Sequence, residues 1–186
     1  MTEPRMLFEP GEQFTTFTPV GVSPLAASPF VFPMGYQNVT DDFLTSDPPR
    51  PEELSALLSV IELHLDDLAR VLGVDASPDD GRTVLDMTFR DGTVLGVGPI
   101  FQTIAAVELG AQPYDAAAVS GFELTRAAAE DVFRTLATES LENRLHNPGL
   151  TAERGPTIVG GCCLVVGAYR RFGLKSVVVA GSGDTP

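Results

Sequence analysis

Residues 151–180 read TAERGPTIVGGCCLVVGAYRRFGLKSVVVA, and they indicate the fold class. Residues 151–172 predict an apolar helix, and Gly173 predicts its end. Residues 177–180 then predict a short buried strand, because apolar residues follow one another there without interruption. A helix that leads directly into a buried strand is typical of an α/β protein.

The rest of the chain continues this alternation of helix and strand. Residues 45–49 predict a helix start, and apolar residues at intervals of three and four from Leu54 to Leu72 predict a long amphipathic helix that ends at Gly73. Residues 82–97 predict a hairpin whose turn is Asp91-Gly92. The remaining predicted elements are a helix at 99–109 closed by Gly110, a strand at 122–124 and a helix at 126–137 capped by Thr125.

The first fifty residues are rich in proline, threonine and phenylalanine. Residues 14–20 and 30–34 predict short β segments. Prolines at positions 19, 24, 29 and 33 lack the amide hydrogen that a central strand needs, so we expect edge strands or irregular extended pieces.

Length and charge limit the class of protein and its partners. With 186 residues, 44% of them hydrophobic, the chain suits one domain spanning residues 1–186. Its formal net charge of -13 should repel polyanions, so nucleic acid is not an expected partner. The N-terminus lacks the basic start of a secretion signal, and the longest apolar run, residues 158–168, is too short to span a membrane. We therefore expect no membrane partner and a cytoplasmic location.

Several residues invite a chemical interpretation that the surrounding sequence does not support. Cys162 and Cys163 are adjacent and predict buried thiols in a reducing compartment, without a zinc pattern. His64 and His146 stand in no metal-binding spacing, and no histidine matches a serine nucleophile. We therefore expect neither a metal site nor a catalytic residue.

Two glycine pairs and two arginines leave alternatives open. Gly96 and Gly98 precede a predicted helix, but Phe101 replaces the third glycine of a dinucleotide fingerprint, so they predict either a tight turn or a simple anion site. Gly160-Gly161 costs about 1 kcal/mol per residue inside a helix, which implies close packing or a ligand. Arg144 and Arg154 predict either ligand contacts or salt bridges at a helix corner.

Several motifs occur in the order found in one known family. Residues 34–49, MGYQNVTDDFLTSDPP, resemble Gly-x-x-Arg-Leu-Thr-Glu followed by Asp-Pro-Pro. Tyr114-Asp115, Gly121, Leu124-Thr125-Arg126, Arg144, Pro148-Gly149-Leu150, Glu153-Arg154 and residues 158–161 follow in order, and residues 177–184 resemble a final Val-x-x-Ser-Glu-x-x-Leu. From about residue 30 onward, the chain thus resembles the second half of the catalytic core of the exopolyphosphatase and guanosine pentaphosphate phosphohydrolase family.

This resemblance implies a fold and a size. The family's core has two actin-like, ribonuclease-H-like halves, so we expect half of an actin-like ATPase fold, with a mixed sheet and flanking helices. Residues 1–29 are expected to be divergent or irregular. The first half of the core, which carries a phosphate loop and the catalytic glutamate, has no counterpart in this sequence.

The departures from the family pattern all concern groups that would bind phosphate. Residues 9–13, Glu-Pro-Gly-Glu-Gln, stand where the family has Asp-Ile-Gly-Gly-Gly-Ser-Thr-Glu, and Gly98-Pro99-Ile100 replaces Ala-Gly-Thr. Asn38 replaces an arginine, and Ala180-Gly181 replaces Ser-Glu. A proline offers no amide to an anion, and glutamates repel it.

The sequence therefore predicts a degenerate, non-catalytic pseudoenzyme that acts through a protein partner or a homodimer, or through weak binding of a phosphate ligand. The alternative is one subunit of a split phosphohydrolase, which would act on polyphosphate or guanosine pentaphosphate with Mg²⁺ and a separate N-terminal half. Residues expected to keep any ligand contact are Asn38, Gly96, Gly98, Arg144, Arg154, Gly160 and Gly161.

Overall fold

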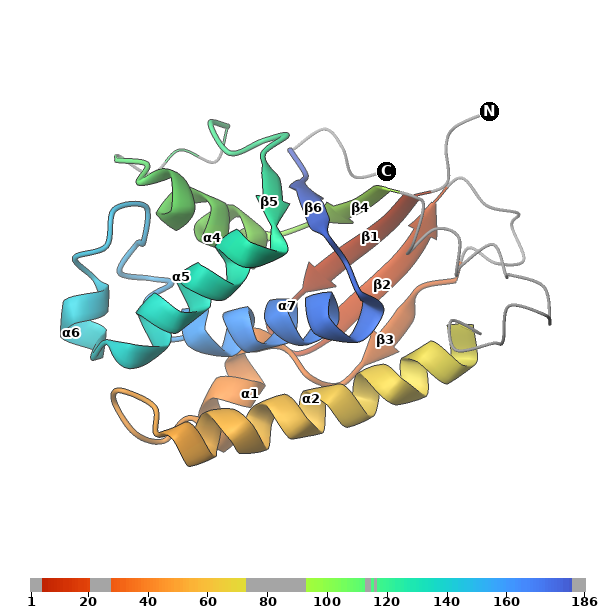
Figure 1. Cartoon of the computed structure of the whole chain (residues 1–186), viewed down its shortest axis with the longest axis horizontal. Coiled ribbons are helices and arrows are strands. Elements are labelled where there is room, and N and C mark those ends of the chain that lie inside the picture. Colours follow the sequence, from red (N-terminus) through yellow and green to blue (C-terminus); the bar gives the residue numbers. More distant parts are fainter. Residues whose placement is uncertain (1–4, 21–27, 73–92, 113–114, 116, 182–186) are drawn as a thin grey trace.

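A mixed β-sheet with helices packed against it forms the body of the computed structural model, which describes residues 5–20, 28–72, 93–112, 115 and 117–181 (Figure 1). The strands are β1 (Arg5–Pro10), β2 (Thr15–Val20), β3 (Phe30–Phe32), β4 (Thr93–Gly96), β5 (Glu123–Thr125) and β6 (Ser176–Val179). The helices are α1 (Tyr36–Phe43), α2 (Pro51–Leu72), α4 (Pro99–Leu109), α5 (Arg126–Thr138), α6 (Leu141–Arg144) and α7 (Ile158–Phe172).

The order of the strands is β3-β2-β1-β4-β6-β5. Three strands, β1, β4 and β6, run parallel in the middle, while β2 and β3 on one side and β5 on the other pair antiparallel. The expected mixed sheet with flanking helices is confirmed. Because parallel strands end at the same side of a sheet, the carboxyl ends of β1, β4 and β6 share one edge, called the carboxyl edge below.

The hairpin of β1 and β2 corrects the prediction for the N-terminal region. We expected edge strands or irregular pieces there, but residues 5–20 form two regular strands, and β2 has a neighbour on each side. Pro19 is tolerated because β3 pairs only with residues 15–17 of β2, so the strand has one neighbour at Pro19. The hairpin is well packed, with the rings of Phe8 and Phe17 stacked at 4.5 Å between centroids.

The helix α7 is the centre of the core. It lies between α2 and α5 in Figure 1, and it also contacts α1 and α4. Every residue from Ile158 to Tyr169 is buried. The helix begins at Ile158 and not at residue 151 as predicted, because a residue before proline disfavours helical backbone, and Pro156 interrupts the segment. Gly173 ends it with a φ of 64°, as predicted.

Most other elements confirm the sequence predictions. The helices α4 and α5 begin where expected, and the hydroxyl of Thr125 accepts a hydrogen bond from the amide of Ala128. The helix α2 begins at Pro51, just after the predicted start at residues 45–49. The strand β5 begins one residue later than predicted. The predicted turn at Asp91-Gly92 lies outside the described residues, which include only β4 from that hairpin. The helices α1 and α6 were not predicted.

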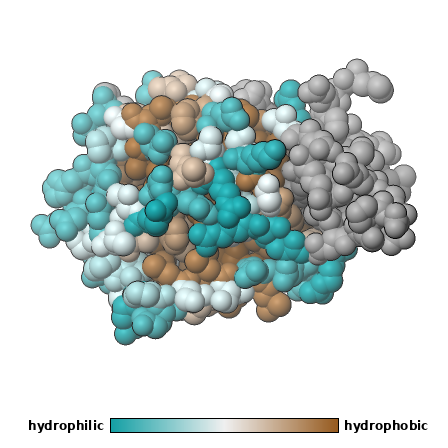
Figure 2. All heavy atoms as spheres, viewed as in Figure 1, coloured by the Kyte–Doolittle hydropathy of each residue, from teal (hydrophilic) through white to brown (hydrophobic). Residues whose placement is uncertain are grey.

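The surface of the face seen in Figure 1 is largely hydrophilic, with a band of apolar surface beside α2 (Figure 2). Within the described part of the chain, no helix has the length and apolar character needed to cross a membrane.

Candidate functional site

The carboxyl edge of the sheet is the first place to look for a ligand, because open α/β sheets bind ligands where their strands end. Four segments meet there. The amide of Val97 donates to the carbonyl of Phe8, and the amide of Ala180 donates to that of Gly96, both at 2.9 Å. The amide of Tyr36, at the start of α1, donates to the carbonyl of Gly11 in the β1–β2 turn. The carboxyl edge therefore brings together residues 9–13 and 98–100, the two turns whose sequences differ from the family's phosphate loops.

Glu9 lies beside the start of α4. Gly98 precedes this helix with a φ of 89°, and a methyl group added to it would lie 3.6 Å from Cγ and Oε1 of Glu9. Pro99 opens the helix and has no amide hydrogen to offer. A carboxylate is favourable at the positive end of a helix dipole. The chain thus places its own anion where an external anion would approach.

Both polar atoms of the Asn38 side chain are hydrogen-bonded to the backbone of the chain. Its Oδ1 accepts from the amide of Gly35 at 2.7 Å, which caps α1. Its Nδ2 donates to the carbonyl of Gln13 at 3.0 Å and to that of Pro33 at 3.4 Å. Asn38 therefore lies beside the β1–β2 turn, and its side-chain amide group holds that turn to α1.

Three of the predicted glycines allow close packing. A methyl group on Gly160 would lie 2.3 Å from Oγ1 of Thr40 in α1, and one on Gly161 would lie 2.6 Å from Cδ1 of Ile100. A methyl group on Gly96 would lie 2.5 Å from the ring of Phe101. For Gly160-Gly161, the sequence left packing and a ligand open, and the structure places packed neighbours there.

The two predicted arginines do not face a common ligand. The guanidinium of Arg154 lies over the ring of Tyr36, 5.9 Å from its centroid, and Nη1 donates to the tyrosine hydroxyl at 3.3 Å. Nη2 of Arg154 also pairs with Oε1 of Glu153 at 3.0 Å. Arg154 thus links the segment before α7 to α1.

Arg144 is buried, with 3% of the residue exposed, and its three side-chain nitrogens all donate to backbone carbonyls. Nε bonds to Leu136 at 2.9 Å, Nη1 to Gly155 at 3.1 Å and Nη2 to Glu139 at 2.8 Å. Burial lowers the pKa of Arg144, and the charge of Asp47, 3.8 Å away, opposes that shift. This arginine ties the end of α5 to the segment before α7, and its ion pair with Asp47 agrees with the salt-bridge alternative.

The segment between α1 and α2 is fixed by Glu53. Its Oε1 accepts from the hydroxyl of Thr45 at 2.6 Å and from that of Ser46 at 3.1 Å, and its Oε2 accepts from the amide of Arg50 at 2.9 Å. These bonds, with that of Thr45 the largest cause, lower the pKa of Glu53 to about 2. Asp47 in the same segment accepts from the amide of Leu141, 2.9 Å from each carboxylate oxygen.

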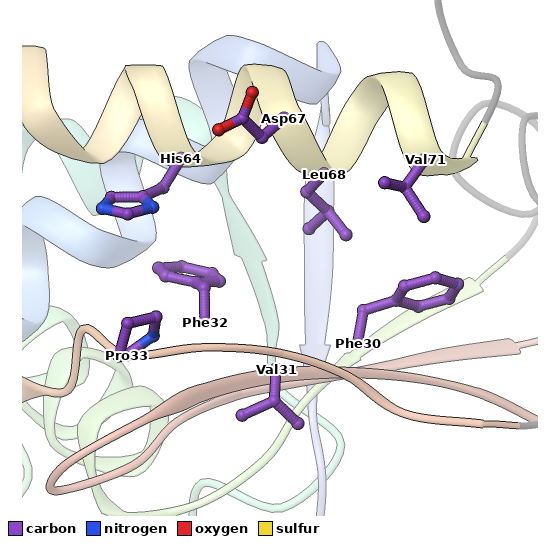
Figure 3. A pocket seen from close by; sticks show the side chains of 8 residues that line it. All are labelled: Phe30, Val31, Phe32, Pro33, His64, Asp67, Leu68 and Val71. Atoms are coloured by element: carbon purple, nitrogen blue, oxygen red, sulfur yellow. The ribbon is translucent and has the colours of Figure 1, made fainter.

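Among the cavities that the described residues form away from the carboxyl edge, two lie between different elements of the fold. The first, of about 200 Å³, lies between α1, the segment 44–49, α6 and the start of α7, and Arg144 lines it. The second, of about 300 Å³, is an apolar groove between β3 and α2 (Figure 3). Figure 3 shows Phe32 facing His64 across this groove, with ring centroids 6.1 Å apart, while Val31 points away from it. His64 thus packs against an aromatic ring.

The described residues contain no group of three or more histidine, cysteine, aspartate or glutamate side chains placed to hold a metal ion. Cys162 and Cys163 are free and buried in α7, as predicted. Burial raises the pKa of Cys162 to about 12, so its reactive thiolate form is scarce at neutral pH.

No protein-family model matches the sequence, and no curated protein matches it. Solved structures do share its fold. The Aquifex aeolicus Ppx/GppA phosphatase, in its type II variant, matches with a TM-score of 0.77 at 23% identity, over 97% of this chain and 54% of that chain. An exopolyphosphatase-like protein gives 0.78 at 20% identity, over 95% and 55%. An exopolyphosphatase from Cytophaga hutchinsonii ATCC 33406 gives 0.71 at 15% identity, over 96% and 53%.

These likenesses confirm the expected fold. The chain has the actin-like α/β fold of the Ppx/GppA phosphatases, and it spans about half the length of the structures that it matches. Since the match covers 97% of the chain, it extends beyond the part from about residue 30 onward to which the sequence motifs limited the resemblance.

Proposed function

We propose that this chain is a non-hydrolytic domain with half of the Ppx/GppA fold, which acts through contacts with a protein partner or a second copy of itself. The observation that carries the proposal is the position of Glu9. Its carboxylate lies beside Gly98 at the start of α4, so the edge presents negative charge where a phosphate would need positive charge.

The chemistry of the neighbouring groups supports the same conclusion. Pro10 and Pro99 supply no amide hydrogens, Glu12 adds a second carboxylate, and the amide group of Asn38 is already hydrogen-bonded. Phosphoryl transfer depends almost entirely on positioned charge. An edge with two carboxylates and with prolines in both turns therefore offers little stabilisation to a phosphate or to its transition state.

The β1–β2 turn also carries a feature that suits a protein contact. Phe14 stands on this turn with 53% of the residue exposed, although aromatic side chains are usually buried. Exposed aromatic residues are frequent anchors of protein interfaces. A location in the cytoplasm is part of the proposal, and the free thiols of Cys162 and Cys163 support a reducing compartment.

An assay of phosphate release tests the proposal. The chain is incubated with Mg²⁺ and either polyphosphate or guanosine pentaphosphate, with the Aquifex aeolicus Ppx/GppA phosphatase as the positive control. We expect no release above the blank. Release that rises in proportion to the concentration of the chain would overturn the proposal.

The second candidate is a subunit of a split phosphohydrolase, and the span of 53–55% of the matched structures favours it. Such an enzyme would complete its site with a separate N-terminal half. Glu9 and Glu12 are the carboxylates next to the two altered turns, and the described residues contain no group of three or more histidine, cysteine, aspartate or glutamate side chains that could hold a metal ion. Any Mg²⁺ would therefore need ligands from the other half or from the substrate. Phosphate release that requires both chains would favour this candidate over the first.

A further inference from the structure

The cavity beside Arg144 has a chemical character of its own. Figure 1 shows that the connection between α1 and α2 lies at the same end of the molecule as α6. The cavity between them has walls of Leu44, Pro49, Leu141 and Val159, and its polar lining includes Thr45, Ser46 and Asp47. Its volume of about 200 Å³ suits one extended side chain, and all of its lining residues belong to the described part of the chain.

The hydroxyl groups of this cavity have already used their donors, and three of the five N–H groups of Arg144 are hydrogen-bonded. The hydroxyls of Thr45 and Ser46 donate to Glu53, and each side-chain nitrogen of Arg144 donates to a backbone carbonyl. Thr40, which also lines the cavity, donates to the carbonyl of Tyr36 at 2.7 Å. The three hydroxyl oxygens and the carboxylate of Asp47 can still accept hydrogen bonds from a ligand.

The segments around the cavity carry more acids than arginines. The lining itself has one carboxylate, Asp47, and one guanidinium, Arg144. Residues 36–53 and 138–147, which supply most of that lining, also carry the acids Asp41, Asp42, Glu52, Glu53, Glu139 and Glu142 and the arginine Arg50. Arg50 pairs with Glu53, and Arg144 points its nitrogens at backbone carbonyls. The carboxylate of Asp47 is 52% exposed, so it remains accessible.

We propose that this cavity binds a lysine side chain of a protein partner. The apolar walls would hold the methylene stem, and the ammonium group would donate its three protons to the hydroxyl oxygens and to Asp47. An anion would meet the lone pairs of the three hydroxyl oxygens and the charge of Asp47. The proposal rests on the proposed function in one respect, that the chain acts through protein contacts.

The test is a titration of the ¹⁵N-labelled chain with N-acetyl-lysine methylamide, followed by NMR. The control probe is N-acetyl-norleucine methylamide, which has an apolar side chain without the ammonium group. We expect saturable shifts for the lysine probe at the amides of Ser46 and Leu141, because Leu141 donates to Asp47. Equal shifts with both probes, or no shifts at these amides, would overturn the proposal.

A variant pair sharpens this result. Asp47→Asn keeps an oxygen for the amide of Leu141 but removes the charge, so we expect lysine affinity to fall about threefold to fivefold. Asp131→Asn removes an exposed charge on α5 and should leave the affinity unchanged. An unchanged affinity in Asp47→Asn would contradict the proposal, and if that variant fails to fold, the two probes on the original chain still decide.

The outcomes separate this inference from the proposed function. If the lysine probe fails and the chain releases no phosphate, the cavity proposal falls alone. If the probe binds as expected and the chain hydrolyses polyphosphate, the proposed function falls and the lysine site stands.

Discussion

The carboxyl edge and the cluster of Thr45, Asp47, Glu53 and Arg144 differ in how they use their charges. At the edge, Glu9 lies beside a helix start and its neighbours are prolines and a second glutamate. In the cluster, each of the four side chains is hydrogen-bonded to another part of the chain. The charged groups of the cluster therefore hold the fold together, whereas the carboxylates of the edge are the groups on which our proposal of a non-hydrolytic domain rests.

The largest effect should come from Arg144→Met. The substitution leaves the carbonyls of Leu136, Glu139 and Gly155 without their donor and Asp47 without its nearby charge. We expect the free energy of unfolding to fall by about 3–5 kcal/mol, measured by urea denaturation. Arg134→Met is the control, because that side chain is 70% exposed, and it should change stability by less than about 0.5 kcal/mol. Similar losses in both variants would contradict a structural role for Arg144.

Gly160→Ala should have the next largest effect. The added methyl group would lie 2.3 Å from Oγ1 of Thr40 and 3.0 Å from the carbonyl oxygen of Tyr36, so α1 would have to move. We expect a loss of about 1–3 kcal/mol in the free energy of unfolding. Gly161→Ala is the matched control, because it meets the flexible side chain of Ile100, and its loss should be smaller. A larger loss for Gly161→Ala would contradict close packing between α1 and α7.

The packed regions were the most predictable from the sequence. The α/β class, the long helix α2, and the ends of α4 and α7 at Gly110 and Gly173 follow from apolar spacing and from glycine at helix ends. The strand β1 was missed because of its pairing partners. One of them, β4, lies far away in the sequence, and the other, β2, contains a proline. Short strands depend on such partners more than on their own residues.

A smaller effect is expected at the edge itself. Asn38→Ala removes the hydrogen bonds to Gly35, Gln13 and Pro33 and should lower the free energy of unfolding by about 1 kcal/mol. Gln37→Ala, whose side chain bonds to Asp41 on the exposed side, should cost less in the same denaturation experiment. If Asn38→Ala instead left stability unchanged and altered phosphate affinity, Asn38 would be a ligand contact.

The smallest effect should appear in the dependence of stability on pH. The pKa of Glu53 is about 2 in the folded chain and 4.5 in its ordinary range, so its stabilising contribution is present above pH 4.5 and is lost as the pH falls toward 2. Thr45→Val removes the largest cause of this shift and raises the folded pKa, so the pH-dependent loss should be smaller and should be complete at a higher pH. Acid denaturation followed by circular dichroism measures it.

The control for that experiment is Thr138→Val, since the hydroxyl of Thr138 donates to backbone carbonyls on α5 and not to a carboxylate. Its acid transition should match that of the original chain. A transition that moves equally in both variants would show that Glu53 is not responsible.

The candidate site was less predictable than the fold, for reasons visible in single residues. Asn38, Arg144 and Gly160 were recognised as special positions, but sequence does not show whether a side chain faces a ligand or its own backbone. The roles of Asp47 and Thr45 were missed because their partners, Leu141 and Glu53, are fixed by the fold. An Arg-x-x-Glu spacing at residues 50–53 was the available signal, since Glu53 accepts from the amide of Arg50.

The most direct test of this account of the carboxyl edge is a calorimetric titration of polyphosphate with Mg²⁺ into the chain. Because the carboxyl edge presents Glu9 and Glu12 and no free side-chain donor from Asn38, we predict no saturable heat at millimolar polyphosphate. Saturable binding that weakens with added salt, together with amide shifts at Gly98 and in the β1–β2 turn, would contradict this prediction and would make the edge a phosphate site.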